Sequence, residues 1–183
     1  TYLASSVVSK YLRENGNVRK STAAEKLYHA KLANLEAAIM CNHKRTIPIT
    51  FEQTLQKKIN VLKTVEKANP WKMKDIALKK VESAIPKTDT QKEKQKERIK
   101  KAKEQIKKSK QKHKDRVEKL KLQVDLTKKT KDYNLGTSLR NYIDPRIFKS
   151  WSDEIDAEWD KLYTMALQKK FLWVKSLNES WNQ

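Results

Sequence analysis

The chain has 183 residues, of which 35% are charged, and its net charge is +20. Two glycines and four prolines provide few residues for tight turns, which argues against an all-β fold and a Rossmann-type α/β fold. Ala, Leu, Lys, Glu and Gln are abundant, and these residues favour helices. The composition therefore predicts an all-α protein with a polyanionic partner, for which nucleic acid is the default and an acidic membrane the rival.

The sequence carries no signal for a membrane segment, a disulfide or a metal site. No stretch approaches the roughly 18 consecutive apolar residues needed to span a bilayer, and no signal peptide opens the chain. Cys41 is the single cysteine, which excludes an intrachain disulfide and fits a reducing compartment. The three histidines lack metal-ligand spacing with Cys or carboxylates, so we expect no metal and no cofactor. The chain opens at Thr1 rather than at methionine, which indicates a fragment or a processed product.

The first 50 residues predict two helices. An apolar stripe over residues 7–12 ends before the turn signal at 15–17. Thr22 and Glu25 fit a capping box, which predicts the start of a second helix. Apolar residues then recur at spacings of four, three and four on one helical face: Tyr28, Leu32, Leu35 and Ile39.

A first long arm is predicted from Phe51 to Ile85. Asn69-Pro70 interrupts it, because proline costs about 3 kcal/mol inside a helix, so we expect a kink or a restart with Asn69 as the cap. Trp71 follows this break and either packs at the kink or lies exposed.

A second arm is predicted from Thr90 to Lys131, after a turn at residues 86–89. Its seam residues recur every three or four positions, nearly a heptad pattern: Ile99, Ala102, Ile106, Ser109, His113, Val117, Leu120 and Val124. Residues 87–131 hold 19 basic and 7 acidic side chains, so this quarter of the chain carries most of the charge. The two arms predict a protruding antiparallel hairpin whose charge either contacts phosphates without reading sequence or is incidental to a solvated helix.

The last segment, residues 132–183, changes character and is close to electrically neutral. It is rich in aromatic residues, which predicts a small compact helical lobe: Phe148, Trp151, Trp159, Tyr163, Phe171, Trp173 and Trp181. Leu167, Phe171 and Val174 are expected on one helical face.

Tyr142 lies between a short Gly/Thr/Ser turn and a helix start. Asp144-Pro145 is the start signal, with Asp as the cap and Pro at the first helical position. A turn of this kind can present a hydroxyl on a rigid base, and a phenol can attack phosphorus when its proton is removed. The alternative is a tyrosine packed in the lobe.

His43 is expected at the C-terminal end of the second helix, near Cys41. Beside Lys44 and Arg45 it could donate a hydrogen bond to a phosphate oxygen. The alternative is a surface or helix-capping histidine, and His29 and His113 have weaker claims to a chemical role.

These segments together resemble the C-terminal portion of the eukaryotic and archaeal type IB DNA topoisomerases. The similar motifs are Thr1-Tyr2 with Ala4-Ser5, Cys41-Asn42-His43-Lys44-Arg45, the Gly136-Thr137-Ser138 to Arg146 segment, and Lys170-Phe171 with Trp173. The resemblance covers essentially the whole chain. It implies three parts: the end of the catalytic core over 1–50, a basic coiled-coil linker over 51–131, and a C-terminal domain over 132–183.

The resemblance also implies an activity and its residues. Tyr142 would be the nucleophile that forms a 3′-phosphotyrosyl bond, and His43 would stabilise the transition state. Lys44, Arg45, Asn141 and Thr137 would contact DNA, with Asn141 at the cleavage site and Thr137 affecting the balance of cleavage and religation. The enzyme would relax supercoils without ATP or metal, as a monomer when complete, inside the cell on chromosomal DNA: in the nucleoid if archaeal, in the nucleus if eukaryotic.

The family uses two arginines and a lysine that this chain does not contain at matching positions. One arginine should immediately precede Thr1, and the remaining N-terminal part of the enzyme would be a partner. Without these cations the transition state should lose several kcal/mol of stabilisation, so we expect the chain alone to be inactive or nearly so.

Two alternatives remain at this point. A tyrosine recombinase shares the chemistry, but that family typically lacks a long basic hairpin between its histidine and its tyrosine. A non-catalytic basic coiled-coil protein that binds nucleic acid explains the charge and leaves the motifs around His43 and Tyr142 as coincidence.

Overall fold

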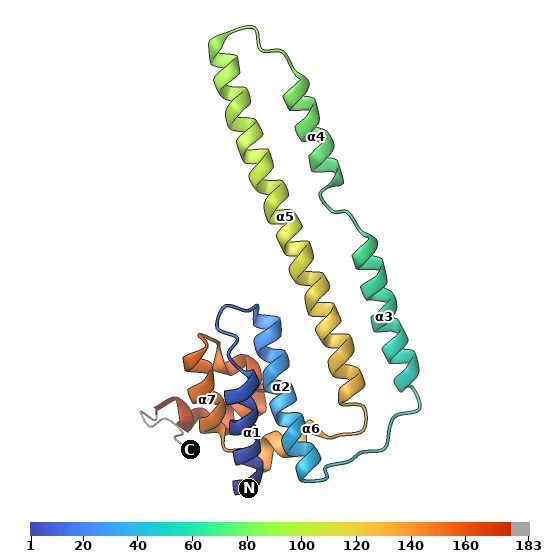
Figure 1. Cartoon of the computed structure of the whole chain (residues 1–183), viewed down its shortest axis with the longest axis vertical. Helices are drawn as coiled ribbons and strands as arrows, with labels where there is room; N and C mark the ends of the chain where they lie inside the picture. Colours follow the sequence, from blue (N-terminus) through green and yellow to red (C-terminus); the bar gives the residue numbers. More distant parts are fainter. Residues whose placement is uncertain (177–183) are drawn as a thin grey trace. The chain divides into compact units, whose positions relative to one another are not determined.

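The computed structural model describes residues 1–176, and this range is helical, with no β-strand among the described residues. The helices are α1 (Tyr2–Asn15), α2 (Ala23–Met40), α3 (Phe51–Lys67), α4 (Lys72–Ser83), α5 (Asp89–Lys129), α6 (Leu135–Asn141), α7 (Pro145–Glu154) and α8 (Met165–Lys170), with the 3-10 helices η1 (Trp159–Leu162) and η2 (Leu172–Ser176) (Figure 1). The predicted all-α class is confirmed. Trp181 lies outside the described residues.

The chain divides into two compact units. One contains residues 1–58 and 121–183, and the other contains residues 59–120. The first unit therefore draws on both ends of the chain, and the second is inserted between them.

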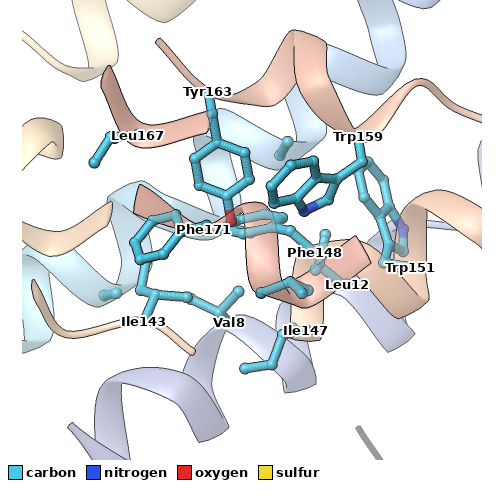
Figure 2. Close-up of a cluster of buried hydrophobic side chains, with 14 of the residues drawn as sticks. Val8, Leu12, Ile143, Ile147, Phe148, Trp151, Trp159, Tyr163, Leu167 and Phe171 are labelled. Carbon is cyan, nitrogen blue, oxygen red and sulfur yellow. The ribbon is translucent and has the colours of Figure 1, made fainter. Parts of the chain in front are cut away.

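The core of the first unit joins α1 and α2 to the C-terminal helices. Val8 and Leu12 on α1 lie in one cluster with Phe148 and Trp151 on α7, all at most 5% exposed (Figure 2). The Trp151 indole N–H donates a hydrogen bond to the Gly16 carbonyl at 3.0 Å, which fixes the turn after α1. The segments 1–50 and 132–176 thus share one core, while the status of 1–50 and 132–183 as separate domains stays a prediction.

Aromatic rings fill the C-terminal side of this core. The Tyr163 ring packs against Phe148, Trp159 and Phe171, with centroid distances of 6.2, 4.9 and 5.4 Å. Burial raises the pKa of the Tyr163 phenol, and the charge of Asp144 raises it further. The predicted aromatic lobe is therefore a packed structure, except that Trp173 is 49% exposed.

The helix signals in the N-terminal segment hold, but the buried face of α2 differs from the predicted one. Thr22 and Glu25 form the expected capping box. The buried side of α2 is built mostly from alanines, with Leu35 and Asn34, whereas Ile39 is 44% exposed. Alanines allow α1 to approach closely, so small residues rather than the large apolar ones decide which face packs.

In the second unit, α4 and α5 form an antiparallel hairpin. The predicted break near Pro70 is confirmed, since α3 ends at Lys67 and α4 begins at Lys72, but the N-cap is Trp71 and not Asn69. The Trp71 ring packs edge-on against His113 with centroids 5.2 Å apart, so it does pack at the break.

The seam of α5 is confirmed, and the first arm is shorter than predicted. All eight predicted seam residues are buried or half-buried. The first arm ends at Ser83, and Ile85 is 89% exposed. The Gln95 amide donates to the Val81 and Ala84 carbonyls, both at 2.6 Å, which satisfies carbonyls left open at the end of α4.

Residues of the C-terminal segment predicted on one helical face are all buried but do not share a helix. Leu167 lies in α8, Phe171 caps that helix, and Val174 lies in η2. The chain turns between them, so burial rather than a continuous helix explains their spacing.

Candidate active site

His43 follows directly on a left-handed residue at the end of α2. Cys41 caps the helix, and Asn42 has a φ of 53°, a conformation that asparagine tolerates better than most residues. The chain then folds back, so that the His43 N–H donates to the Ala38 carbonyl at 2.8 Å. The histidine backbone is therefore fixed to the last turn of α2, as expected from the sequence.

A short antiparallel pairing attaches this segment to the chain just before α6. The Asn134 N–H donates to the His43 carbonyl at 2.8 Å, and the Arg45 N–H donates to the Asp132 carbonyl at 2.9 Å. Lys44 and Tyr133 form an isolated β-bridge between these bonds. The pairing brings the start of α6 beside the histidine.

Tyr142 caps the C-terminal end of α6, just before the start of α7. Its N–H donates to the Ser138 carbonyl at 2.9 Å, and Asp144 caps α7 by accepting from the Arg146 N–H at 2.9 Å. The predicted place of Tyr142, in a turn just before a helix that starts at Pro145, is confirmed. The predicted Gly/Thr/Ser turn is wrong, because these residues lie in α6, whose N-cap Asn134 accepts from the backbone of its first turn.

The fold brings His43 and Tyr142 into contact. Their rings pack edge-on at 61°, with centroids 4.7 Å apart. The His43 Nδ1 atom lies 2.7 Å from the Ser138 hydroxyl oxygen, and Ser138 is fully buried. Two residues that the sequence singled out separately therefore form one site, and Ser138 links them.

Helix α1 supports the tyrosine turn from the other side. The Ser5 hydroxyl accepts from the Asp144 N–H at 3.0 Å and donates to the Tyr142 carbonyl at 3.4 Å. Ser5 is 1% exposed. Ser5 lies in one of the motifs of the sequence, but its role was not predictable from the sequence because its partners are distant in the chain.

The four residues predicted to contact DNA have different surroundings. Lys44 and Asn141 are exposed, and Thr137 is half-buried on α6. Arg45 is engaged at the C-terminal end of α5, where its guanidinium donates to the Lys131 carbonyl at 3.1 Å and the Thr130 carbonyl at 3.3 Å. These two carbonyls directly follow α5, so the contact places the positive charge of Arg45 at the negative end of the helix dipole.

A polar network holds the last turns of α5 against α2. The Tyr28 hydroxyl donates to Asp125, and Lys129 donates to the Tyr28 oxygen at 2.9 Å and pairs with Asp125 at 2.8 Å. Burial raises the pKa of Asp125, but the hydrogen bonds from Lys129 and Tyr28 outweigh it and lower this pKa below its usual value. Hydrogen bonds to Asp125 and Tyr28 raise the pKa of Lys129.

Chemically, the site combines a phenol with an imidazole whose second nitrogen is available. Within residues 1–176, His43 Nε2 makes no hydrogen bond to another side chain or to the backbone. The described residues contain no group of three or more His, Cys, Asp or Glu side chains placed to hold a metal.

Two family models match this chain, one at each end. Residues 1–77 match the catalytic core of eukaryotic DNA topoisomerase I, and residues 114–183 match the C-terminal topoisomerase domain. The first match contains His43, and the second contains Tyr142.

The chain belongs to the eukaryotic DNA topoisomerase I family.

Individual relatives match nearly the whole chain. DNA topoisomerase 1 of Caenorhabditis elegans is 32% identical over 184 residues, which cover 98% of this chain and 20% of that protein. The mitochondrial DNA topoisomerase I of Rattus norvegicus is 32% identical over 174 residues, 95% of this chain and 28% of that protein. DNA topoisomerase 1 of Drosophila melanogaster is 34% identical over 158 residues, 84% of this chain and 14% of that protein. The chain thus spans between 14% and 28% of the length of these topoisomerases.

Proposed function

We propose that this chain supplies the histidine and the nucleophilic tyrosine of a type IB DNA topoisomerase. The observation that carries the proposal is the contact between the His43 and Tyr142 rings, which come from the two separate chain segments of the first unit. A tyrosine recombinase would use similar chemistry, but the two family matches favour the topoisomerase.

In the proposed reaction the Tyr142 phenol oxygen attacks a phosphorus of duplex DNA. The oxygen–phosphorus bond to tyrosine forms as the bond to the 5′ oxygen breaks; the phenol loses its proton and the 5′ oxygen gains one. The phosphotyrosyl bond conserves the energy of the phosphodiester, so religation needs no ATP. While the strand is open, the downstream duplex rotates and supercoils are released.

His43 would stabilise the phosphorane-like transition state. Its Nδ1 is already engaged by Ser138, which leaves Nε2 as the nitrogen that can donate to a non-bridging phosphate oxygen. Donors placed in advance at a site of developing charge contribute about 3–4 kcal/mol each in other enzymes. Lys44, exposed next to His43, adds a positive charge to the same region.

Two further DNA contacts, an indirect role for Arg45 and the hairpin complete the proposal. Asn141 and Thr137 lie on α6, whose C-terminal end is capped by Tyr142, so both are close in the chain to the proposed cleavage site. Arg45 would act indirectly, by fixing the end of α5. The hairpin, with 19 basic and 7 acidic side chains over 87–131, would attract the duplex by phosphate contacts that carry no sequence preference.

We further propose that the chain needs the N-terminal part of the enzyme for activity. The resemblance implies two arginines and a lysine that lie upstream of Thr1, and the relatives are several times longer than this chain. The substrate is duplex DNA, and the complete enzyme would be a monomer acting wherever that DNA lies, including a nucleus or a mitochondrion. None of the helices over residues 1–176 has the length and apolarity to cross a membrane.

Reconstitution tests this function. The chain is mixed with a separately expressed upstream part that carries the two arginines and the lysine, and plasmid relaxation is assayed without ATP or Mg²⁺. We expect relaxation that requires both parts, is abolished by Tyr142→Phe, and survives Tyr133→Phe as the matched control. Relaxation by the chain alone would disprove its dependence on the upstream part. Relaxation by the Tyr142→Phe variant would disprove the role of Tyr142 as the nucleophile.

A further inference from the structure

We propose that Ser138 is a positioning residue that fixes the tautomer and the orientation of His43, and thereby directs Nε2–H toward the scissile phosphate. The proposal rests on the proposed function for its catalytic consequence. Its structural part, the state of the His43 ring, is independent of catalysis.

The buried Ser138 hydroxyl has His43 as its hydrogen-bond partner. Ser138 is 0% exposed, and His43 Nδ1, at 2.7 Å, is the partner of its hydroxyl among the described residues. If Nδ1 carried the proton in the neutral ring, the hydroxyl hydrogen would be left without an acceptor in a dry site. An unpaired buried donor costs about 1–3 kcal/mol, so the bond runs from the Ser138 hydroxyl to Nδ1.

This hydrogen bond decides the protonation of the other ring nitrogen of His43. A neutral imidazole whose Nδ1 accepts a hydrogen bond carries its proton on Nε2. This nitrogen has no hydrogen-bond partner within residues 1–176. The ring is therefore preset as a donor from Nε2, before DNA binds.

Ser138 also holds the turn that carries Tyr142. Its carbonyl accepts from the Tyr142 N–H at 2.9 Å and from the Ile143 N–H at 3.2 Å. The side chain and the main chain of one residue thus contact the histidine and the tyrosine turn. The N-cap of α6, Asn134, is also hydrogen-bonded to the His43 carbonyl. Two separate contacts, through Asn134 and through Ser138, therefore fix the position of His43 relative to Tyr142.

The tautomer is tested directly by NMR. Ring nitrogen shifts of His43 are recorded in the 183-residue chain labelled with ¹⁵N, at a pH where the ring is neutral. We expect the Nε2–H form in the unchanged chain and a mixture with the Nδ1–H form in Ser138→Ala. A ring in the Nδ1–H form, or one whose tautomer does not respond to Ser138→Ala, would overturn the proposal.

The catalytic consequence is tested by a double-mutant cycle on the reconstituted enzyme, measured as single-turnover cleavage of a DNA substrate. Ser138→Ala should slow cleavage roughly tenfold to a hundredfold, the range found for groups that orient metal-bound histidines. In the His43→Ala background the same substitution should change the rate less than about twofold, because two residues that act through one interaction are not additive.

A matched control separates this effect from a loss of packing. Ser152 is also 0% exposed in a helix, and its hydroxyl donates to the Phe148 carbonyl, away from the site. Ser152→Ala should leave cleavage unchanged. Equal slowing by Ser138→Ala in both backgrounds would show a structural role and refute the proposal, whereas activity in Tyr142→Phe would remove the proposed function on which its catalytic part rests.

Discussion

The substitution Ser5→Ala tests whether α1 holds the tyrosine turn. The Ser5 hydroxyl bridges the Tyr142 carbonyl and the Asp144 N–H, and its side chain is almost wholly buried. Alanine removes the bridge without adding bulk. The N-terminal cap of α7 would remain, because Asp144 bonds to it through a different atom.

The expected loss of stability follows from the group left behind. The Asp144 N–H loses its acceptor, which costs about 1–3 kcal/mol where water cannot replace it. Asp144 is half-buried, so the lower part of this range applies. Alanine gains up to about 0.5 kcal/mol of helix propensity over serine, and the net destabilisation should be about 1 kcal/mol.

Ser9 provides the control one helical turn along α1. It is 8% exposed, and the described residues give its hydroxyl no hydrogen-bond partner. Ser9→Ala should be neutral or slightly stabilising, by up to about 0.5 kcal/mol from propensity. Denaturant unfolding of the chain, followed by tryptophan fluorescence, should therefore separate the two variants by about 1–2 kcal/mol.

Cleavage by the reconstituted enzyme supplies the second measurement. Displacement of a reacting group by about 1 Å can cost a hundredfold in rate, so Ser5→Ala should slow cleavage about tenfold or more while Ser9→Ala does not. If the two variants were equal in stability and in cleavage, α1 would have no part in positioning Tyr142.

Three further outcomes follow from local contacts. Gly16→Ala should destabilise the chain by about 2 kcal/mol or more, because its Cβ would lie 2.3 Å from the Leu12 carbonyl oxygen and 2.6 Å from the Trp151 indole nitrogen. The control is Gly136→Ala, whose Cβ meets only a side-chain oxygen at 3.3 Å. In the same unfolding assay this control should cost less than about 0.5 kcal/mol. The pKa of Asp125 is lowered by folding, so this carboxylate adds to the free energy of unfolding above the unfolded pKa of 3.8, and that addition is lost as the pH falls through the lower folded pKa. Asp125→Asn should therefore reduce stability at neutral pH. It should also make the free energy of unfolding fall less steeply with decreasing pH in the acid range. Removal of the indole in Trp71→Ala should increase hydrogen exchange at the start of α4, where the ring packs on α5.

The helices were predictable because their signals are local. The capping box at Thr22, the break near Pro70 and the helix start at Asp144 each depend on a few neighbouring residues. Details that depend on distant packing were not predictable, and the cap expected at Asn69 falls on Trp71 because that ring packs on the opposite arm.

In the candidate site, too, features that depend on neighbouring residues were predictable and those that depend on distant contacts were not. His43 and Tyr142 could be singled out from the motifs around them. The serines that hold them were missed as functional residues, because Ser138 and Ser5 have their partners far away in the chain. The DNA contact expected for Arg45 stays a prediction, and its hydrogen bonds to the Thr130 and Lys131 carbonyls just after α5 depend on the fold and were not predictable from the sequence.

The contacts that define the site all lie in the first unit, which suggests a final test. Its two segments, 1–58 and 121–183, are joined by the shared core and by the pairing of His43 with Asn134. A specific protease site inserted after Pro86, between α4 and α5, would cut the connection without touching these contacts. The pieces should remain together through gel filtration, and the near-ultraviolet circular dichroism of the aromatic core should be unchanged. Separation of the pieces without denaturant would show that the hairpin connection, rather than the shared core, holds His43 against Tyr142.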